Sequence, residues 1–274
     1  MKPIAVKDYL VSQETFNIVY DHGLDAWKTT PQPSESLLKE YYPKQGYLSH
    51  ADTAKSLKDR LYLWIKSRNI QTKLNWIPIK QSQPKLLDFG AGNGAFALAA
   101  QAKGWKVHTQ EFSDQAITSL QGKGLSVVDV SQQTNAYDAI TLWHVFEHLP
   151  NPISQLSTFY DALVPGGIVA LALPNIDAWD AQHYGSHWAA YDVPRHLWHY
   201  NKSAIAQLAS SSGFHLLKTH NMYWDAFYIS LLSEQYRQSK YPWIKACLNG
   251  ALSNVYGWSE KNTSSLTFIL QKPK

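Results

Sequence analysis

The chain has 274 residues, a formal net charge of +4 at pH 7 and a single cysteine, Cys247. A chain of this length can bury a core without covalent staples, and one cysteine excludes an intrachain disulfide or a cysteine zinc cage. The charge is only mildly positive and includes no run of five like charges, which gives no support for nucleic-acid binding. The first residues contain no apolar signal segment and no apolar run is long enough to span a membrane, so we expect a cytoplasmic protein.

The first part of the chain, residues 1–80, is expected to form a β-hairpin followed by helices. Segments 14–20 and 26–30 have the composition of strands, and turn residues lie between them. A short helix over 34–43 and a longer helix beginning near Ser49 are predicted next. We interpret this region as an extension of the main domain and as a possible lid.

From residue 85 onward, strands and helices alternate along the sequence, which is typical of crossover units and a parallel, doubly wound α/β sheet. Ligands bind beyond the carboxyl ends of the strands in such sheets, near the switch point in strand order. We therefore expect one domain over 81–274, with a helical insertion at about 222–258. Strands are predicted at 85–90, 105–112, 125–130, 138–145, 168–174, 214–220 and 264–272, and helices at 94–104, 113–124, from 151, 203–212 and 243–256.

The turn after the first of these strands, DFGAGNG, holds Asp88, Gly90, Gly92 and Gly94. A turn without side chains lets a ligand approach the backbone and the N-terminus of the next helix. The same glycines fit a dinucleotide fingerprint, with Glu111 about 20 residues further on, so they do not choose a cofactor by themselves. The charge of Asp88 disfavours a pyrophosphate and favours a ligand that carries an ammonium and a sulfonium group.

Further candidate binding residues follow the second, third and fourth strands. Glu111 can accept hydrogen bonds from both hydroxyls of a ribose, and Asp129 is placed to reach an exocyclic amine such as that of adenine. Phe112 and Trp143 offer apolar faces for a base.

Four segments together resemble the class I S-adenosylmethionine-dependent methyltransferases, in particular the small-molecule branch that includes quinone O-methyltransferases. They are DFGAGNG (88–94), QEFS (110–113), YDAITLWHVFEHLPNP (137–152) and LVPGGIVALALPN (163–175), and the resemblance extends from about Lys85 to the C-terminus.

The resemblance implies a Rossmann-like, seven-stranded, mainly parallel sheet with an antiparallel last strand. It also implies S-adenosyl-L-methionine as methyl donor and S-adenosyl-L-homocysteine as product. Some relatives carry a cysteine zinc ribbon near the N-terminus, but this region contains no cysteine here, and we expect no zinc. The cofactor-binding positions are expected to be Asp88, Gly90, Ala91, Gly92, Gly94, Glu111, Phe112, Asp129 and Trp143.

The segment after the fourth strand contains His144-x-x-Glu147-His148, which matches the H-x-x-E-H pattern of zinc peptidases. A zinc helix needs several turns, whereas here a strand runs into His144, and Pro150 and Pro152 restrict the helix that follows. We therefore expect no metal. His148 either faces the methyl acceptor as a catalytic group or hydrogen-bonds the backbone, and His144 is either structural or an acceptor contact.

The segment 183–200, HYGSHWAAYDVPRHLWHY, gathers histidines and aromatic residues at the same edge of the sheet. A metal cluster is disfavoured because the histidines have no regular spacing. Two interpretations remain open. One is a folding brace in which Asp192 and Arg195 pair. The other is an acceptor site, with His196 as general base or orienting group, Arg195 holding an anionic group, and Trp188 and Asp192 as further contacts.

By family architecture, Tyr47 and His50 are expected to lie in a lid over the cofactor, and Tyr47 is also a candidate contact of the acceptor. The aromatic segment 224–236 lines an acceptor pocket, forms a homodimer face or packs in the core. The sequence as a whole predicts a metal-independent methyltransferase that methylates a small molecule, through oxygen. The alternatives are a catalytically silent cofactor binder of the same fold and a nicotinamide oxidoreductase, which Asp88 and the EHLP and PGG motifs disfavour.

Overall fold

The structure is a computed structural model that describes residues 2–43, 57–77 and 82–274. Its main sheet has seven strands in the order β10-β11-β8-β7-β4-β5-β6. Neighbours from β8 to β6 pair in parallel, and β11 lies antiparallel between β8 and β10. The predicted Rossmann-like sheet with an antiparallel last strand is confirmed. The strands are β4 (Lys85–Phe89), β5 (Lys106–Gln110), β6 (Ser126–Val127), β7 (Tyr137–Trp143), β8 (Leu163–Pro174), β10 (His215–Asn221) and β11 (Ser265–Gln271).

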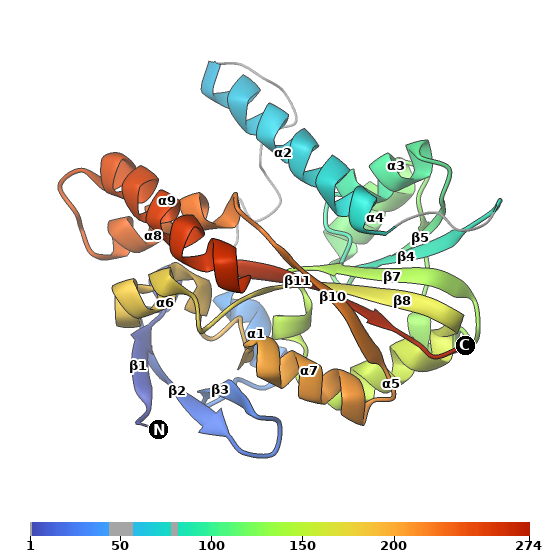
Figure 1. Cartoon of the computed structure of the whole chain (residues 1–274), viewed down its shortest axis with the longest axis horizontal. Helices are drawn as coiled ribbons and strands as arrows, with labels where there is room; N and C mark the ends of the chain where they lie inside the picture. The colour runs from blue at the N-terminus through green and yellow to red at the C-terminus, as the bar shows by residue number, and fades with distance from the viewer. Residues whose placement is uncertain (1, 44–56, 78–81) are drawn as a thin grey trace.

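Helices cover both faces of this sheet, as expected for a doubly wound fold (Figure 1). One face carries α2 (Leu57–Trp76), α3 (Ala95–Ala102) and α4 (Asp114–Gly122), and the other carries α5 (Pro152–Ala162) and α7 (Lys202–Ser211). Asn151 and Pro152 begin α5 as the sequence predicts, because proline at the first helical position sacrifices no hydrogen bond.

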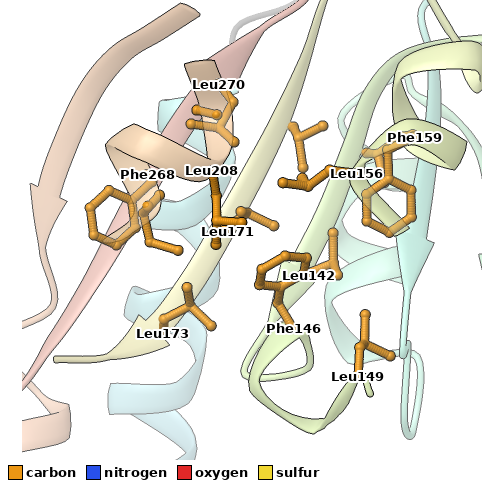
Figure 2. Packing of buried hydrophobic residues seen from close by; sticks show 14 of the residues in the cluster. Leu142, Phe146, Leu149, Leu156, Phe159, Leu171, Leu173, Leu208, Phe268 and Leu270 are labelled. Carbon is orange, nitrogen blue, oxygen red and sulfur yellow. The ribbon is translucent and has the colours of Figure 1, made fainter. Parts of the chain in front are cut away.

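Alternate residues of the strands supply an apolar cluster on each face. Leu87 of β4 joins the cluster beneath α5 and α7, whereas its neighbour Leu86 joins the cluster beneath α2, α3 and α4. Figure 2 shows the first cluster, in which Leu156 and Phe159 of α5 pack with Leu142 of β7. Each fully buried side chain of this size contributes about 1.5–3 kcal/mol of transfer free energy, so the sheet is a rigid support for the strand ends.

A second, antiparallel sheet contains the predicted N-terminal hairpin. Its strands are ordered β1-β2-β3-β9, and the hairpin consists of β2 (Thr15–Asp21) and β3 (Ala26–Thr30), preceded by β1 (Ile4–Lys7). The fourth strand, β9 (Trp198–His199), comes from the segment 183–200 and pairs with β3. Strand β9 was not predictable, because a two-residue strand has no measurable periodicity. The division of the chain at residue 80 stays a prediction.

Three further predictions for the N-terminal region have different outcomes. The longer helix is α2, described over Leu57–Trp76, and its predicted start near Ser49 lies outside the described residues. The helix expected over 34–43 is reduced to α1 (Glu35–Leu38) and a 3₁₀ turn, Lys39–Tyr41. Tyr47 and His50, the predicted lid residues, lie outside the described residues.

The expected helical insertion consists of α8 (Asp225–Tyr236) and α9 (Pro242–Glu260), which follow β10 and precede β11 in the sequence. The two helices pack on each other. A short helix, α6 (Trp179–Tyr184), lies against the same pair. Among the helices of the described ranges, none combines the length and hydropathy that crossing a membrane requires.

Candidate functional site

The backbone of the glycine turn between β4 and α3 is accessible to a ligand at one of its glycines. Gly90, Gly92 and Gly94 all have positive φ angles, of 72°, 54° and 77°. A Cβ atom on Gly90 would lie 2.5 Å from Val145, and one on Gly94 would lie 2.8 Å from Leu120, so these two glycines permit close packing. No described atom lies within 4 Å of the same position on Gly92. A ligand can therefore reach the turn at Gly92.

The carboxylate of Glu111 is fixed beside this open glycine. Its Oε2 accepts a hydrogen bond of 2.7 Å from the Gly92 amide, and its Oε1 accepts one of 2.8 Å from the Phe112 amide. Each oxygen keeps a second lone pair. The neighbouring Phe112 ring is 60% exposed and meets Phe89 edge-on. An oriented carboxylate next to an exposed ring fits a nucleoside, with ribose hydroxyls on Glu111 and the base against Phe112.

Asp88 lies at the end of β4 and is almost completely buried. The Thr141 hydroxyl, on the neighbouring strand β7, donates a hydrogen bond of 2.8 Å to its Oδ1. Burial raises the pKa of Asp88 to about 7, although the Thr141 hydrogen bond and the charge of Lys73 act in the opposite direction. A cationic ligand group nearby would favour the ionised carboxylate.

Trp143, at the end of β7, packs against the helices on the face of α2 and α3. Its ring centroid lies 4.9 Å from that of Phe96, and the Lys73 ammonium lies 4.5 Å above the ring. Within the described ranges, its buried indole N–H has no hydrogen-bond partner. Burial lowers the pKa of Lys73, against the charges of Asp225 and Asp88. Sequence reasoning missed Lys73, because only the packing of α2 brings it to this strand end.

Asp129 lies two residues after β6, on the surface. Its Oδ1 accepts hydrogen bonds from the Ser131 amide, at 2.9 Å, and from the Ser131 hydroxyl, at 2.8 Å. These bonds cap a short 3₁₀ turn and hold the pKa of Asp129 below its usual range. The role in binding adenine stays a prediction.

His144 links the end of β7 to the helical insertion. Its Nε2 lies 3.0 Å from Oδ2 of Asp225 on α8, and its Nδ1 lies 3.5 Å from Oε1 of Glu147. Burial disfavours the charged ring, but the two carboxylates outweigh it and raise the pKa of His144 to about 9. His144 is therefore cationic at neutral pH and has no lone pair with which to accept a proton.

Two imidazoles and a buried carboxylate meet just beyond this strand end. Nδ1 of His148 lies 2.9 Å from the Arg195 carbonyl, and Nδ1 of His196 lies 2.9 Å from the Ala190 carbonyl. Because a carbonyl only accepts, we infer that Nδ1 of each ring carries a proton, and in a neutral His148 ring this leaves the lone pair on Nε2. Glu147 is 1% exposed, and neither of its oxygens has a hydrogen-bond partner in the described chain.

These three side chains, Glu147, His148 and His196, each offer a ligand atom within 4.8 Å of the others. Burial, together with the charge of His196, lowers the pKa of His148 to about 4, so its ring is neutral at pH 7. A neutral imidazole beside a carboxylate can accept a proton, and two imidazoles with a carboxylate can also bind a divalent cation. The expectation that the protein binds no metal stays a prediction.

Arg195 has the contacts of the predicted folding brace. Its Nη2 lies 2.9 Å from Oδ1 of Asp8 and 2.8 Å from Oδ1 of Asp192, and its Nη1 donates to the Tyr41 carbonyl at 2.7 Å. Arg195 and Trp188 are both 1% exposed. The guanidinium thus joins the segment 183–200 to the N-terminal sheet. The acceptor contacts predicted for Arg195, Trp188 and Asp192 stay predictions.

Comparison with known proteins decides the family. A protein-family model described as a methyltransferase domain matches residues 60–219, which is more than half of the chain. The chain belongs to this methyltransferase family.

Individual relatives agree with this assignment. A ubiquinone biosynthesis O-methyltransferase of Burkholderia thailandensis is 25% identical over 167 residues, 53% of this chain and 72% of that protein. A phosphoethanolamine N-methyltransferase 2 of Haemonchus contortus, solved with S-adenosyl-L-methionine, has a TM-score of 0.53 at 19% identity, over 76% of this chain and 53% of that one. The [4+2]-cyclase SpnF has a TM-score of 0.54 at 16% identity, over 77% and 82% of the two chains.

The methyltransferase identified here is of class I and uses S-adenosyl-L-methionine. The open turn at Gly92 and the oriented carboxylate of Glu111 have the chemistry that such a cofactor requires, and their role in binding it stays a prediction. The structural neighbours share the fold, and their different reactions show that the fold does not identify the acceptor.

Proposed function

We propose that this methyltransferase methylates an oxygen atom of a small-molecule acceptor. The observation that carries the proposal is the position of His148 and His196, each of which has a ring nitrogen within 4.8 Å of a Glu147 carboxylate oxygen. A hydroxyl or phenol must lose a proton as its oxygen attacks a methyl group, and a neutral imidazole is suited to accept that proton.

The chain's own residues bind and position the reactants. S-adenosylmethionine, when bound, supplies a methyl group on a positively charged sulfur. We assign its ribose to Glu111 and its ammonium group to Asp88, which places the methyl group near the carboxyl ends of β4 and β7. Holding the acceptor oxygen in line with that group, away from water, can contribute much of the rate.

Among the imidazoles at the site, we assign proton acceptance to His148. Its side chain is partly exposed, whereas His196 and Arg195 are buried. The role of His196 is then to position His148. The charge of Glu147 favours the imidazolium that forms on His148 and partly offsets the burial that lowers the pKa of this ring to about 4. His144 cannot serve, because its pKa of about 9 keeps it protonated.

The test is transfer of a labelled methyl group from the cofactor to a pool of hydroxylated small molecules. We expect a methyl ether as product, and His148→Asn should lower kcat by about 10²–10⁴ while S-adenosylhomocysteine still binds. The control is His215→Asn, because His215 is exposed on β10. A product methylated on nitrogen or carbon would contradict the proposal. A protein that binds the cofactor and methylates nothing would instead be the catalytically silent binder.

The proposed chemistry needs no metal ion. The negative charge of Glu147 already has a partner, because cationic His144 lies 3.5 Å away. Dialysis against a chelator should therefore leave the rate unchanged. A loss of activity that a divalent cation restores would contradict this and would assign Glu147, His148 and His196 to metal binding.

A further inference from the structure

Helix α9 buries its small side chains. The face packed against the protein consists of Ala246, Gly250, Ser253 and Gly257, all of which are buried. The fit is close, since a Cβ atom on Gly250 would lie 2.7 Å from the ring of Phe227 on α8. A helix that faces water on its outer side normally does the reverse, with large apolar residues inward and polar residues outward.

The outer face of α9 carries large apolar side chains instead. Ile244, Leu248, Val255 and Trp258 are each between 60% and 72% exposed. Their spacings of four, seven and three residues place them along one side of the helix, and Leu252 lies next to them. We call these five residues the α9 patch. Single exposed apolar residues are common, but a contiguous group of this size marks an interaction surface. Figure 1 shows α9 at the outer edge of the molecule.

The charges around the α9 patch are almost all positive. Arg237, Lys240, Lys245 and Lys261 are exposed and lie within α9 or in the segments directly before and after it, and Glu260 is the one acidic residue in the sequence from 237 to 261. An apolar helix face with tryptophan, bordered by lysine and arginine, is the composition of helices that lie in the interface of anionic membranes.

We propose that the α9 patch docks on the surface of an anionic lipid bilayer, with α9 parallel to the membrane plane. A second copy of the chain matches the patch less well. A two-fold interface would set the patch against itself and bring each basic border close to its identical copy. A helix that lies in the interface also agrees with the finding that α9 is not a spanning helix. The proposal does not depend on the identity of the methyl acceptor.

The experiment is co-sedimentation of the full chain with vesicles of phosphatidylcholine, with and without phosphatidylglycerol. We expect at least about tenfold stronger partition to the anionic vesicles, weakened by salt, and a blue shift in tryptophan emission. The triple variant Ile244→Ser, Leu248→Ser, Val255→Ser should lose this partition. Lys240→Glu with Lys245→Glu should lose the preference for anionic lipid. The substituted side chains are exposed, so the melting temperature should change little.

A matched control replaces apolar residues that are exposed elsewhere, Ile153→Ser on α5 with Leu217→Ser on β10, and should bind vesicles as the wild type does. Equal partition of the triple variant and the wild type, or no partition of the wild type, overturns the proposal. Equal binding of the wild type to neutral and to anionic vesicles overturns the proposed preference for anionic lipid. If light scattering shows that the wild type is a dimer and the triple variant a monomer, and neither binds vesicles, then the α9 patch is covered by a second copy of the chain and not by lipid.

Discussion

The imidazole Nε2 of His144 lies 3.0 Å from the Asp225 carboxylate and joins the end of β7 to the first residue of α8. Glu147 approaches the other ring nitrogen at 3.5 Å. Burial disfavours the charged ring, but the two carboxylates raise the pKa of His144 to about 9. At neutral pH an ion pair therefore holds the helical insertion against the strand end where the site is built.

This ion pair predicts a pH-dependent stability. The folded-state pKa of His144 lies above the unfolded value of 6.5, so its contribution is complete below pH 6.5 and is lost as the pH rises through about 9. We expect a contribution of about 1–2 kcal/mol, less than the full shift implies, because a third of the ring is exposed. Urea unfolding of the wild type and of Asp225→Asn, at about pH 6 and about pH 10, measures it. The difference in unfolding free energy between the wild type and Asp225→Asn should be smaller at the higher pH. An equal difference at both pH values would contradict the prediction.

Asp88 predicts that cofactor binding is linked to a proton. Burial raises its pKa to about 7, and the ammonium group of S-adenosylhomocysteine should lower that pKa on binding. Binding should then release protons near neutral pH, and affinity should fall as the pH drops below 7. Calorimetry in two buffers of different ionisation enthalpy measures the release. Asp88→Asn should bind about tenfold more weakly and without proton release. Equal heats for the wild type in both buffers would exclude this role of Asp88.

Two glycines of the same turn should respond differently to alanine. Gly92→Ala should lower the unfolding free energy by about 1–2 kcal/mol, because Gly92 has a positive φ. Its methyl group would extend into the open space beside the turn, so binding of S-adenosylhomocysteine should weaken at least about tenfold. At Gly90 the methyl group meets Val145 at 2.5 Å, so Gly90→Ala should cost about 3 kcal/mol or more of stability. Thermal unfolding and ligand titration of both variants separate the two effects. Unchanged binding by Gly92→Ala would show that the ligand does not approach this glycine.

The buried contact between Arg195 and Asp8 predicts a structural role. Removing one partner of a buried ion pair costs about 3–5 kcal/mol, because the other charge stays buried. Asp8→Ala should therefore lower the melting temperature by several degrees, comparably to Arg195→Ala, without changing the affinity for S-adenosylhomocysteine. The control is Lys28→Ala, which breaks a partly exposed pair with Asp21 and should cost no more than about 1 kcal/mol. If Asp8→Ala behaves like this control, the brace contributes nothing and Arg195 is available for another task.

The sheet and the glycine turn were predictable because their signals are local. Alternation of strands with helices places β4 and α3 on either side of Gly90, Gly92 and Gly94, and the carboxyl ends of parallel strands meet at one edge. The predicted residue Glu111 lies beside Gly92 for that reason. The sequence also predicts the helical insertion, although α9 extends to Glu260, beyond the expected end at residue 256.

The pairings that complete the site were not predictable, because each joins segments far apart in the sequence. Asp225 lies in a segment whose aromatic residues predict apolar packing, and only the packing of α8 brings it to His144. No local signal in the sequence marks Asp8, which lies against Arg195. The orientation of the two imidazole rings likewise depends on which backbone carbonyls the fold places beside Nδ1 of His148 and of His196.

The central claim is that the open glycine turn, with Glu111 fixed beside it, binds the adenosyl cofactor. Thermal unfolding with S-adenosylhomocysteine or NAD tests this most directly. A ligand at a hundred times its dissociation constant adds about 2.7 kcal/mol to the unfolding free energy, which is a shift of several degrees in melting temperature. We predict this shift with S-adenosylhomocysteine, no shift with NAD, and loss of the shift in Glu111→Ala, with Asp114→Ala on the exposed start of α4 as control. A shift with NAD alone, or an equal response from Glu111→Ala and the wild type, would contradict the claim.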